Sequence, residues 1–380
     1  SEVRYVGGCI RKVIKKEVID DIDLATNLKT KEVCEALKKS NINFYETGID
    51  HGTVTAIIDE YKYEITSLRK DITTDGRHAE VEFSLDWKED AARRDFSINS
   101  IYSDSQGNLF DPNNGKKDLE KGLINFIGDA ETRVKEDYLR ILRYIRFFLN
   151  YSNQKHKPEI IKLIKRNIDG ISNLSSERLL DEFKKLTRSN GFIKLFKDKE
   201  SLELIEIIFP QFKNLKKFKK LNSYAVDNLF KIDFIFLLSL MIIDETDNTD
   251  YFLYKFNLSK KDQKRLKLID NFYKEKVKIT KLAEKNFNKI FYFNGKQAVI
   301  DIINFKLFTS NKVEKRLIQL IKVYQDKLIP TMPIEANMLM TKYNVPQGKT
   351  LGNKLKLIEE IWVNNSFNIS DKQVRKIVKG

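Results

Sequence analysis

The sequence predicts an α+β protein in which a small mixed domain of strands and helices precedes an all-helical remainder. Over residues 1–127, short segments rich in β-branched and aromatic residues alternate with helical segments and turns. From Gly128 onward, apolar residues recur at spacings of three and four, as in Ile141, Ile145 and Phe148. The charge changes at the same place, because residues 1–130 contain 19 Lys and Arg against 25 Asp and Glu, whereas the rest contains 50 against 29.

Five segments of the first domain are predicted to be strands: Val3–Val6, Ile22–Leu24, Phe44–Glu46, Thr53–Ile58 and Tyr61–Thr66. Residues 59–60 predict a hairpin turn between the last two strands, and residues 106–108, with the sequence Gln-Gly-Asn, predict a second hairpin.

Three segments are predicted to be helices. One spans Thr30–Lys39, and Asp86 with Glu89 forms a capping box for another that ends at Ala92. The longest apolar stretch, Phe234–Ile243, is too short to cross a bilayer and predicts a buried helix.

The composition limits the classes of site. Cys9 and Cys34 are the only cysteines and there are three histidines, which argues against a disulfide framework and a Cys/His zinc site. We therefore expect a reducing compartment, and no signal peptide, since no charged-then-apolar leader precedes Val6.

The formal charge of +15 is unevenly placed. A base-biased genome would enrich lysine in both parts of the chain alike. It therefore does not explain why residues 1–130 are acidic and the remaining residues are basic. This contrast favours metal chemistry at one end and a bound polyanion, most simply a nucleic acid, at the other.

The first motif joins a glycine pair to two carboxylates. Gly7 and Gly8 end a predicted strand, Arg11 follows, and Asp21 and Asp23 leave one face of the next strand because side chains alternate with period two. Hard oxygen ligands facing a glycine turn suit Mg²⁺ carrying a nucleoside triphosphate, which indicates phosphoryl or nucleotidyl transfer. The alternatives are a plain tight turn and an acidic strand cap.

Glu64, on the strand 61–66, is a third candidate carboxylate, and the three together have the form of a two-metal cluster. The alternative for Glu64 is an ordinary solvent-facing residue.

A charged run at 93–95 follows the helix that begins after Asp86. Arg94 is suited to clamping phosphates and Asp95 to accepting a ribose hydroxyl, whereas the alternative is a solvated cluster at a helix end. The apolar residues that follow alternate as in a strand, and three of them are predicted to point into the core: Phe96, Ile98 and Ile101.

The segment 136–148, EDYLRILRYIRFF, predicts one helix with four residues on one face: Asp137, Arg140, Tyr144 and Phe147. Cytosine and adenine each present an amino donor beside a ring-nitrogen acceptor, so an aspartate beside an arginine would accept C and A and mismatch U and G. Glu136, four residues before Arg140, would hold that arginine. The alternative is an amphipathic surface helix with an ion pair.

Together these motifs resemble the class II tRNA nucleotidyltransferases, the CCA-adding enzymes related to bacterial poly(A) polymerases, and most closely the alphaproteobacterial and mitochondrial form. The resemblance is close over residues 1–190, returns weakly near the C-terminus, and reduces to lysine-rich helices over 191–330. It rests on seven segments in order: GGCIRK, DIDLAT, TGIDHGTVT, YEITSLRKDITTDGRHAEVEF, DWKEDAARRDFSINSIY, FIGDAETRVKEDYLRILRYIRF and LSSERLLDEFKKL.

The resemblance implies roles for the matching residues. It implies metal binding by Asp21 and Asp23 and catalysis by these two with Glu64. It implies nucleotide binding by ten residues: Gly7, Gly8, Arg11, Arg94, Asp95, Asn99, Asp137, Arg140, Arg143 and Arg146. It also implies a mobile loop over 71–82 that assists addition of the final A, and a bracing helix with residues Ser176, Glu177, Arg178 and Glu182.

One position departs from the family pattern. Lys12 stands where the family has an aspartate, and Lys15 and Lys16 replace its usual Leu-Gly. This change either weakens the positioning of Arg11 or adds a phosphate contact.

The implied organisation is a catalytic head (1–127), a neck that recognises the nucleobase (128–190), and a body (191–310) and tail (311–380) that bind tRNA. The implied reaction adds C and A from CTP and ATP to the 3′ acceptor end of tRNA, with two Mg²⁺ ions and no membrane partner. Alternatives are a poly(A) polymerase, an A-only or CC-only enzyme, and an inactive RNA-binding protein. We expect a bacterial cytoplasmic location, or a mitochondrial one in a eukaryote.

Overall fold

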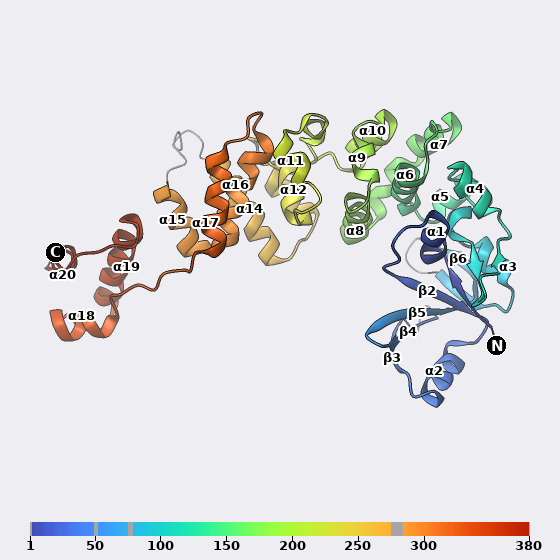
Figure 1. Cartoon of the computed structure of the whole chain (residues 1–380), viewed down its shortest axis with the longest axis horizontal. Coiled ribbons are helices and arrows are strands. Elements are labelled where there is room, and N and C mark those ends of the chain that lie inside the picture. Colours follow the sequence, from blue (N-terminus) through green and yellow to red (C-terminus); the bar gives the residue numbers. More distant parts are fainter. Residues whose placement is uncertain (1, 49–51, 75–78, 275–283, 380) are drawn as a thin grey trace. The chain divides into compact units, whose positions relative to one another are not determined.

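The structure is a computed structural model of the whole chain, and it describes residues 2–48, 52–74, 79–274 and 284–379. Contacts within the chain define two compact units, Ser1–Phe209 and Pro210–Gly380 (Figure 1). The α+β class is confirmed, because a strand-containing head precedes a long series of helices. The division into four domains remains a prediction.

The first unit is built on a seven-stranded sheet in the order β3-β4-β5-β2-β1-β8-β9. Its strands are β1 (Val3–Val6), β2 (Ile22–Thr26), β3 (Asn43–Gly48), β4 (Thr53–Ile58), β5 (Tyr61–Ser67), β8 (Tyr102–Ser103) and β9 (Leu109–Phe110). Strands β2 and β5 run parallel, with Asp23 in register with Glu64. A separate two-stranded sheet contains β6 (Arg69–Thr74) and β7 (Ala79–Phe83).

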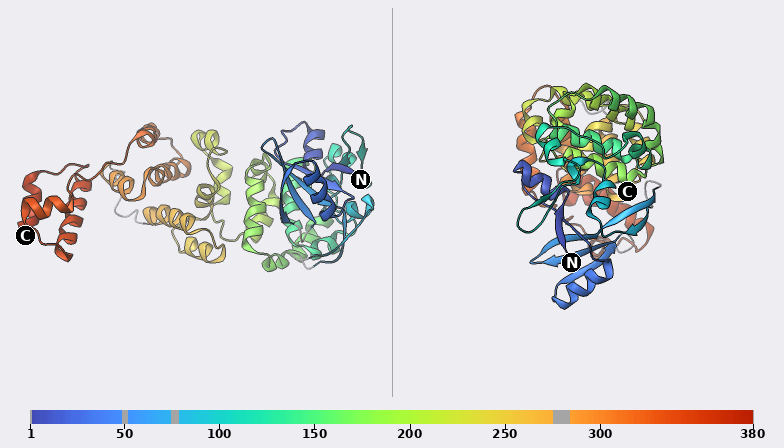
Figure 2. Two further views of the ribbon diagram at one scale, coloured as in Figure 1. Left: turned by 90° about the horizontal axis from the view of Figure 1, so that it is seen from below. Right: turned by 90° about the vertical axis from the view of Figure 1, so that its right-hand side faces the viewer.

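Four helices accompany the sheets: α1 (Gly8–Lys15), α2 (Thr30–Lys39), α3 (Trp87–Ala92) and α4 (Gly115–Lys121). Helix α2 packs on β3 and β4, where Val33 and Val54 share a buried cluster (Figures 1 and 2). Tyr63 and Ile65 of β5 pack against the same cluster, so Glu64 between them points to the opposite face. The acidic residues therefore lie on the face of the sheet that α2 does not cover.

All five predicted strands are present, and β1, β4 and α2 have the predicted bounds. The predicted hairpin turn is also present, because Asp59 and Glu60 both have positive φ, 47° and 69°, as tight hairpins between strands require. The second predicted hairpin, at 106–108, joins β8 to β9.

Two local predictions in the head are wrong. Asp86 caps α3 through the N–H of Lys88, but the carboxylate of Glu89 bonds to the hydroxyl of Ser84 instead of closing a capping box. The expected strand around Phe96 is a 3₁₀ helix, η2 (Ser97–Asn99).

The cause of the second error is local hydrogen bonding. Asp95 accepts from the N–H of Phe96 and from the side chain of Asn99, both at 2.8 Å, and such bonds compete with a strand ladder. The predicted burial is nevertheless correct, because Phe96, Ile98 and Ile101 are fully buried.

The rest of the first unit is helical: α5 (Ala130–Glu136), α6 (Leu139–Tyr151), α7 (Pro158–Asn167), η3 (Ile168–Asn173), α8 (Ser176–Thr187), α9 (Gly191–Leu195) and α10 (Lys199–Ile208). The single helix predicted over 136–148 is wrong, because α5 ends at Glu136 and Asp137 has an extended backbone (φ −152°, ψ 105°). The carboxylate of Asp137 accepts from the N–H of Leu139, so it bonds to the first turn of α6 from outside the helix.

The second unit is all-helical. It contains η4 (Leu215–Lys220), α11 (Ser223–Asn228), α12 (Phe234–Ile242), α13 (Asn248–Lys255), α14 (Lys260–Lys274), α15 (Glu284–Asn294), α16 (Lys296–Thr309), α17 (Lys315–Asp326), α18 (Ala336–Tyr343), α19 (Lys349–Asn364) and α20 (Asp371–Lys379).

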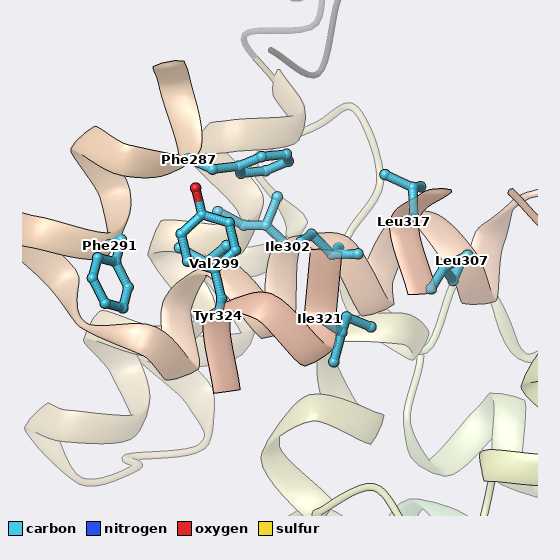
Figure 3. Close-up of a cluster of buried hydrophobic side chains, with 9 residues drawn as sticks. Phe287, Phe291, Val299, Ile302, Leu307, Leu317, Ile321 and Tyr324 are labelled. Carbon is cyan, nitrogen blue, oxygen red and sulfur yellow. The ribbon is translucent and has the colours of Figure 1, made fainter. Parts of the chain in front are cut away.

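Helix α12 confirms the predicted buried apolar helix. A buried cluster joins α15, α16 and α17, where Phe287, Phe291, Val299, Ile302 and Tyr324 pack together (Figure 3). Among the helices that the structure describes, none combines the length and apolarity that crossing a membrane requires.

Candidate active site

Asp23 is the central carboxylate of the acidic face. It is half-buried on β2, whereas Asp21 and Glu64 are exposed. Burial, followed by the negative charges of Asp21 and Glu64, raises the pKa of Asp23 to about 6. The three carboxylates therefore act on one another electrostatically, as the period-two spacing and the β2–β5 register predict.

The three do not form a tight triad. In the described part of the chain, the one group of three His, Asp, Glu or Cys residues whose ligand atoms lie within 4.8 Å of one another is His156, Asp198 and Glu200. The ligand atoms of Asp21, Asp23 and Glu64 are therefore not all within 4.8 Å of one another, although Glu64 is the register partner of Asp23 on the adjacent strand. Their carboxylate oxygens are the ligands that a divalent cation prefers.

The glycine turn brings α1 against this face. Gly7 has φ 72°, and a Cβ there would lie 3.6 Å from both Nη1 of Arg94 and the carbonyl oxygen of Asn99. The thiol of Cys9 contacts the carbonyl oxygens of Val6 and Asp23, at 3.3 and 3.7 Å. The turn thus fixes the start of α1 beside Asp23, where a side chain at position 7 would be strained.

Arg94 is held by a buried carboxylate that sequence reasoning missed. Asp90, only 1% exposed, pairs with Arg94 at 3.1 Å and with Arg93 at 2.7 Å, and the Tyr102 hydroxyl donates to it at 2.6 Å. Burial raises the pKa of Asp90, but the charges of Arg94 and Arg93 outweigh it and lower the pKa to about 2. The spacing of three and four residues before two arginines was the available signal.

We expect Asp90→Asn to destabilise the first unit by about 2 kcal/mol at pH 7, because the folded pKa of Asp90 lies about 2 units below its unfolded value. A depressed carboxyl pKa stabilises the fold above the unfolded pKa and loses that effect as pH falls through the folded one. The difference between variant and parent should therefore shrink between pH 4 and pH 2.

The chain has two tryptophans, Trp87 in the first unit and Trp362 in the second. Urea unfolding followed by Trp87 fluorescence in a Trp362→Phe background measures this effect. Equal destabilisation at pH 7 and pH 2.5 would contradict the ion-pair explanation.

Asp95 and Asn99 connect the head to α6. Asp95 pairs with Arg143 at 2.7 Å and accepts from Asn99, whose side-chain oxygen in turn accepts from Arg11. Burial raises the pKa of Asp95, but Arg143 and Asn99 lower it to about 2. Asp95 therefore orients Arg143 and, through Asn99, Arg11, and its predicted contact with a ribose hydroxyl stays a prediction.

Three arginines surround one aromatic ring. The guanidinium carbons of Arg146, Arg11 and Arg143 lie 4.1, 4.8 and 5.4 Å from the ring centroid of Phe147, which is buried. Burial and the like charges of Arg143 and Arg11 lower the pKa of Arg146, although Glu182 opposes them. We call Arg11, Arg143 and Arg146 the arginine cluster; two carboxylates, Asp95 and Glu182, pair with its members, so its net charge stays positive and suits an anionic ligand.

Helix α8 supports this cluster, as the resemblance predicted. Glu182, 2% exposed, pairs with Arg146 and lies 3.7 Å from Arg143. Arg178 donates to Asp137 at 2.7 Å. The helix therefore contacts both the arginine cluster and the predicted base-reading aspartate.

Asp137 and Arg140 lie one turn apart, since the N–H of Arg140 donates to the carbonyl oxygen of Asp137 at 3.0 Å. The predicted ion pair between Glu136 and Arg140 is present at 2.6 Å. Arg133, which sequence reasoning missed, pairs with Glu136 at 2.5 Å and donates to the carbonyl oxygens of Arg93 and Arg94. Through it, the helix that precedes Asp137 is tied to the end of α3.

Two further predictions concern neighbouring segments. Lys12 pairs with Asp20, so the position that departs from the family pattern bridges α1 and the residue before Asp21. The loop predicted over 71–82 contains residues 75–78, which lie outside the described residues, and its flanks form β6 and β7.

Comparison with known proteins identifies two matching families. A family described as "Poly A polymerase head domain" matches residues 3–125, and one described as "Probable RNA and SrmB- binding site of polymerase A" matches residues 157–216.

Curated relatives are similar over most of the chain. The human protein "CCA tRNA nucleotidyltransferase 1, mitochondrial" is 31% identical over 389 residues, which cover 100% of this chain and 86% of the relative. The "CCA-adding enzyme" of Staphylococcus haemolyticus is 30% identical over 310 residues, covering 80% of this chain and 72% of the relative.

Solved structures share the fold. The Bacillus stearothermophilus CCA-adding enzyme in complex with CTP superposes with a TM-score of 0.77 at 20% identity, over 99% of this chain and 92% of that one. A tRNA nucleotidyltransferase complexed with a primer tRNA and an incoming ATP analog gives a TM-score of 0.62 at 22% identity, over 86% and 94%.

Proposed function

Because this chain belongs to the family of CCA tRNA nucleotidyltransferases, we propose that its first unit carries the active site on the acidic face of the sheet and the arginine cluster. The chain is an enzyme that adds C and A nucleotides to the 3′ end of tRNA without a template, using CTP and ATP and releasing pyrophosphate. The observation that carries this conclusion is the match of the whole chain to 86% of the human relative.

The family's nucleotidyl transfer requires a divalent metal ion, and we propose that this enzyme uses two Mg²⁺ ions held by Asp21 and Asp23. The carboxylate oxygens of Asp21 and Asp23 fit such ions. Burial and two neighbouring carboxylates raise the pKa of Asp23 to about 6, so nearby positive charge does not balance the charge of Asp23, and a bound cation would do so. When bound, the metal would activate the attacking 3′-hydroxyl and neutralise the leaving phosphates. In this proposal Glu64, the register partner of Asp23, is the third catalytic carboxylate and adds negative charge beside the other two.

The arginines would bind the triphosphate. Arg11, Arg143 and Arg146 converge on Phe147, while Asp95 and Glu182 fix two of them in place. Preorganised guanidinium groups bind phosphates without reorganising when the reaction occurs. Arg94, held by Asp90 next to Gly7, would contact the phosphates nearest the carboxylates, with the backbone of Gly7 and Gly8 alongside.

The base would be read by Asp137 as acceptor and Arg140 as donor. Arg178 fixes the former and Glu136 the latter. The excess of lysine and arginine after residue 130 predicts a bound polyanion, and this polyanion is tRNA. The helices after residue 128 would contact the phosphates of the tRNA and would read little of its sequence. We propose a bacterial cytoplasmic or a mitochondrial location; the human relative is named as mitochondrial.

Incubating the purified protein with a tRNA transcript that lacks its 3′ terminus, and with CTP, ATP or both, tests this function. We expect additions to stop after C, C and A when both nucleotides are present. A transcript that already ends in CCA is the control and should not grow.

Other products would identify the alternatives. Addition of a long run of A from ATP alone would identify a poly(A) polymerase. This alternative remains because the family that matches residues 3–125 is described as a poly(A) polymerase head domain. Extension only by C, or only by A, would identify a specialised enzyme. Binding of tRNA without any extension would identify an inactive RNA-binding protein.

A further inference from the structure

The second unit contains a pocket that the reaction described above does not use. It has a volume of about 520 Å³, within the range of roughly 300–1,000 Å³ typical of small-ligand sites. Its lining includes the buried side chains of Phe218, Leu240 and Phe308. Three exposed lysines of η4 also line it: Lys216, Lys217 and Lys220. We call this the lysine-rimmed pocket.

The walls of the pocket are held at both ends of η4. The side chain of Asn222, two residues after η4, donates to the carbonyl oxygens of Leu307 and Ser310, at 2.7 and 2.6 Å, and thereby joins this segment to the end of α16. At the other end, Asn214 donates through its side chain to the carbonyl oxygen of Ile243 at 2.6 Å. These contacts hold η4 against the ends of α12 and α16, whose residues complete the lining of the pocket.

The charge around the pocket selects for an anion. Five of the eight residues 213–220 are lysines, and no acidic residue lines the pocket. Lys217 and Lys220 are exposed, and within the described residues no carboxylate is paired with either of them. A ligand that fits must therefore combine negative charge with a flat apolar surface.

A nucleotide of RNA has that combination. Its base offers an aromatic face that stacks on phenylalanine rings, and its phosphates attract lysines. We propose that the lysine-rimmed pocket takes one unpaired nucleotide of the bound tRNA, with the base on Phe218 and Phe308 and the flanking phosphates on Lys217 and Lys220. This inference rests on the proposed function, since it names a second contact with the same tRNA.

The first test compares two pairs of lysines on one segment. The double variant Lys217→Ala/Lys220→Ala removes lysines that line the pocket, whereas Lys213→Ala/Lys219→Ala removes the same charge from exposed positions that do not line it. We expect the first pair to weaken tRNA binding about tenfold at 0.15 M salt and to lower the salt slope by about one to two, and the second pair to have much less effect. Equal effects would overturn the proposal.

The second test addresses the base. Phe218→Leu should weaken binding by about fivefold or more without changing the salt slope, because stacking is lost and no charge is removed. Asn311→Trp, at an exposed position in the lining, should do the same by filling the pocket, and it covers the case in which Phe218→Leu unfolds the unit. A fully paired RNA duplex should bind all variants like the parent protein. Equal losses for duplex and tRNA would show a backbone contact only and overturn the proposal.

Measurements of tRNA extension distinguish a failure of the proposed function from a failure of the pocket proposal. If the parent protein fails to extend tRNA, the proposed function fails. If it extends tRNA, and the pocket variants keep its KM for tRNA, the function stands and the pocket proposal is wrong. We expect the variants to raise KM for tRNA and to leave kcat unchanged, because the pocket lies in the unit that does not carry the carboxylates. Saturation of the pocket by AMP alone, without an effect on tRNA binding, would also contradict the proposal.

Discussion

Replacing Asp23 by asparagine is expected to reduce nucleotidyl transfer by about 10³-fold or more, while tRNA binding stays close to that of the parent protein. The reason is that Asp23 is the most buried of the three carboxylates, and the amide that replaces it cannot neutralise a divalent cation. Single-turnover extension of a tRNA ending in CC with ATP measures the loss. Retained activity would refute the assignment of Asp23 to the metal.

The same substitution should make the metal-free protein more stable at pH 8. Because the folded pKa of Asp23, about 6, lies above the ordinary aspartate value of 3.8, the folded state holds this proton more tightly than the unfolded state. The carboxylate therefore costs stability progressively as pH rises from about 4 through 6. After allowance for partial exposure, the cost is about 1–2 kcal/mol at pH 8.

Urea unfolding in EDTA, followed by Trp87 fluorescence in a Trp362→Phe background, measures this effect at pH 8 and at pH 4. We expect Asp23→Asn to be more stable than its parent at pH 8 only, and Mg²⁺ to stabilise the parent more than the variant. Asp59→Asn is the matched control, because Asp59 lies in the β4–β5 turn with positive φ, a conformation that asparagine also adopts. A loss of stability at pH 8 in Asp23→Asn would contradict the electrostatic argument.

The sequence predicted regular elements where one signal dominated. The bounds of β1, α2 and β4 followed from apolar alternation and helical spacing, which report burial on one face. The errors near Phe96 and Asp137 have a common cause. At both places an aspartate carboxylate bonds to a nearby backbone N–H, and that bond interrupts the element that the apolar spacing predicted.

The sequence predicted the charged residues of the candidate site, but it did not predict the residues that hold them in place. Residues two apart along an extended chain share a face, so Asp21, which directly precedes β2, and Asp23, which lies on it, could be paired from spacing alone. The contacts of Arg133 with the backbone just after α3 and of the Tyr102 hydroxyl with Asp90 join residues that are distant along the chain, and such contacts arise only when the chain is folded. The same holds for the three arginines around Phe147, which come from α1 and α6.

A second large effect is expected at Asp137. Removing its carboxylate by Asp137→Ala should lower discrimination against UTP and GTP by roughly 10- to 100-fold, because each mismatched hydrogen-bonding pair in a dry pocket costs about 1–3 kcal/mol. The amino groups of C and A lose their acceptor, and the carbonyl groups of U and G no longer meet a negative charge. The ratio of kcat/KM for CTP to that for UTP measures the change.

The contacts of Asp137 allow base reading to be separated from orientation. Arg178→Ala leaves the carboxylate but removes the guanidinium that fixes it, and Glu182 still anchors α8 through Arg146. That variant should raise KM for both CTP and ATP and keep most of the discrimination. If it relaxed selectivity as much as Asp137→Ala, orientation and not hydrogen-bond complementarity would explain the specificity.

A matched control lies at the other end of α5. Asp129 accepts from the N–H of Thr132 at 2.8 Å, so Asp129→Ala removes an aspartate that bonds to a backbone N–H just as Asp137→Ala does. Asp129 caps the first turn of α5, whereas Asp137 follows the last turn of the same helix. Asp129→Ala should therefore leave the preference for C and A unchanged. Unchanged selectivity in Asp137→Ala, or equal losses in both variants, would mean that the aspartate only ends a helix and that the base is read elsewhere.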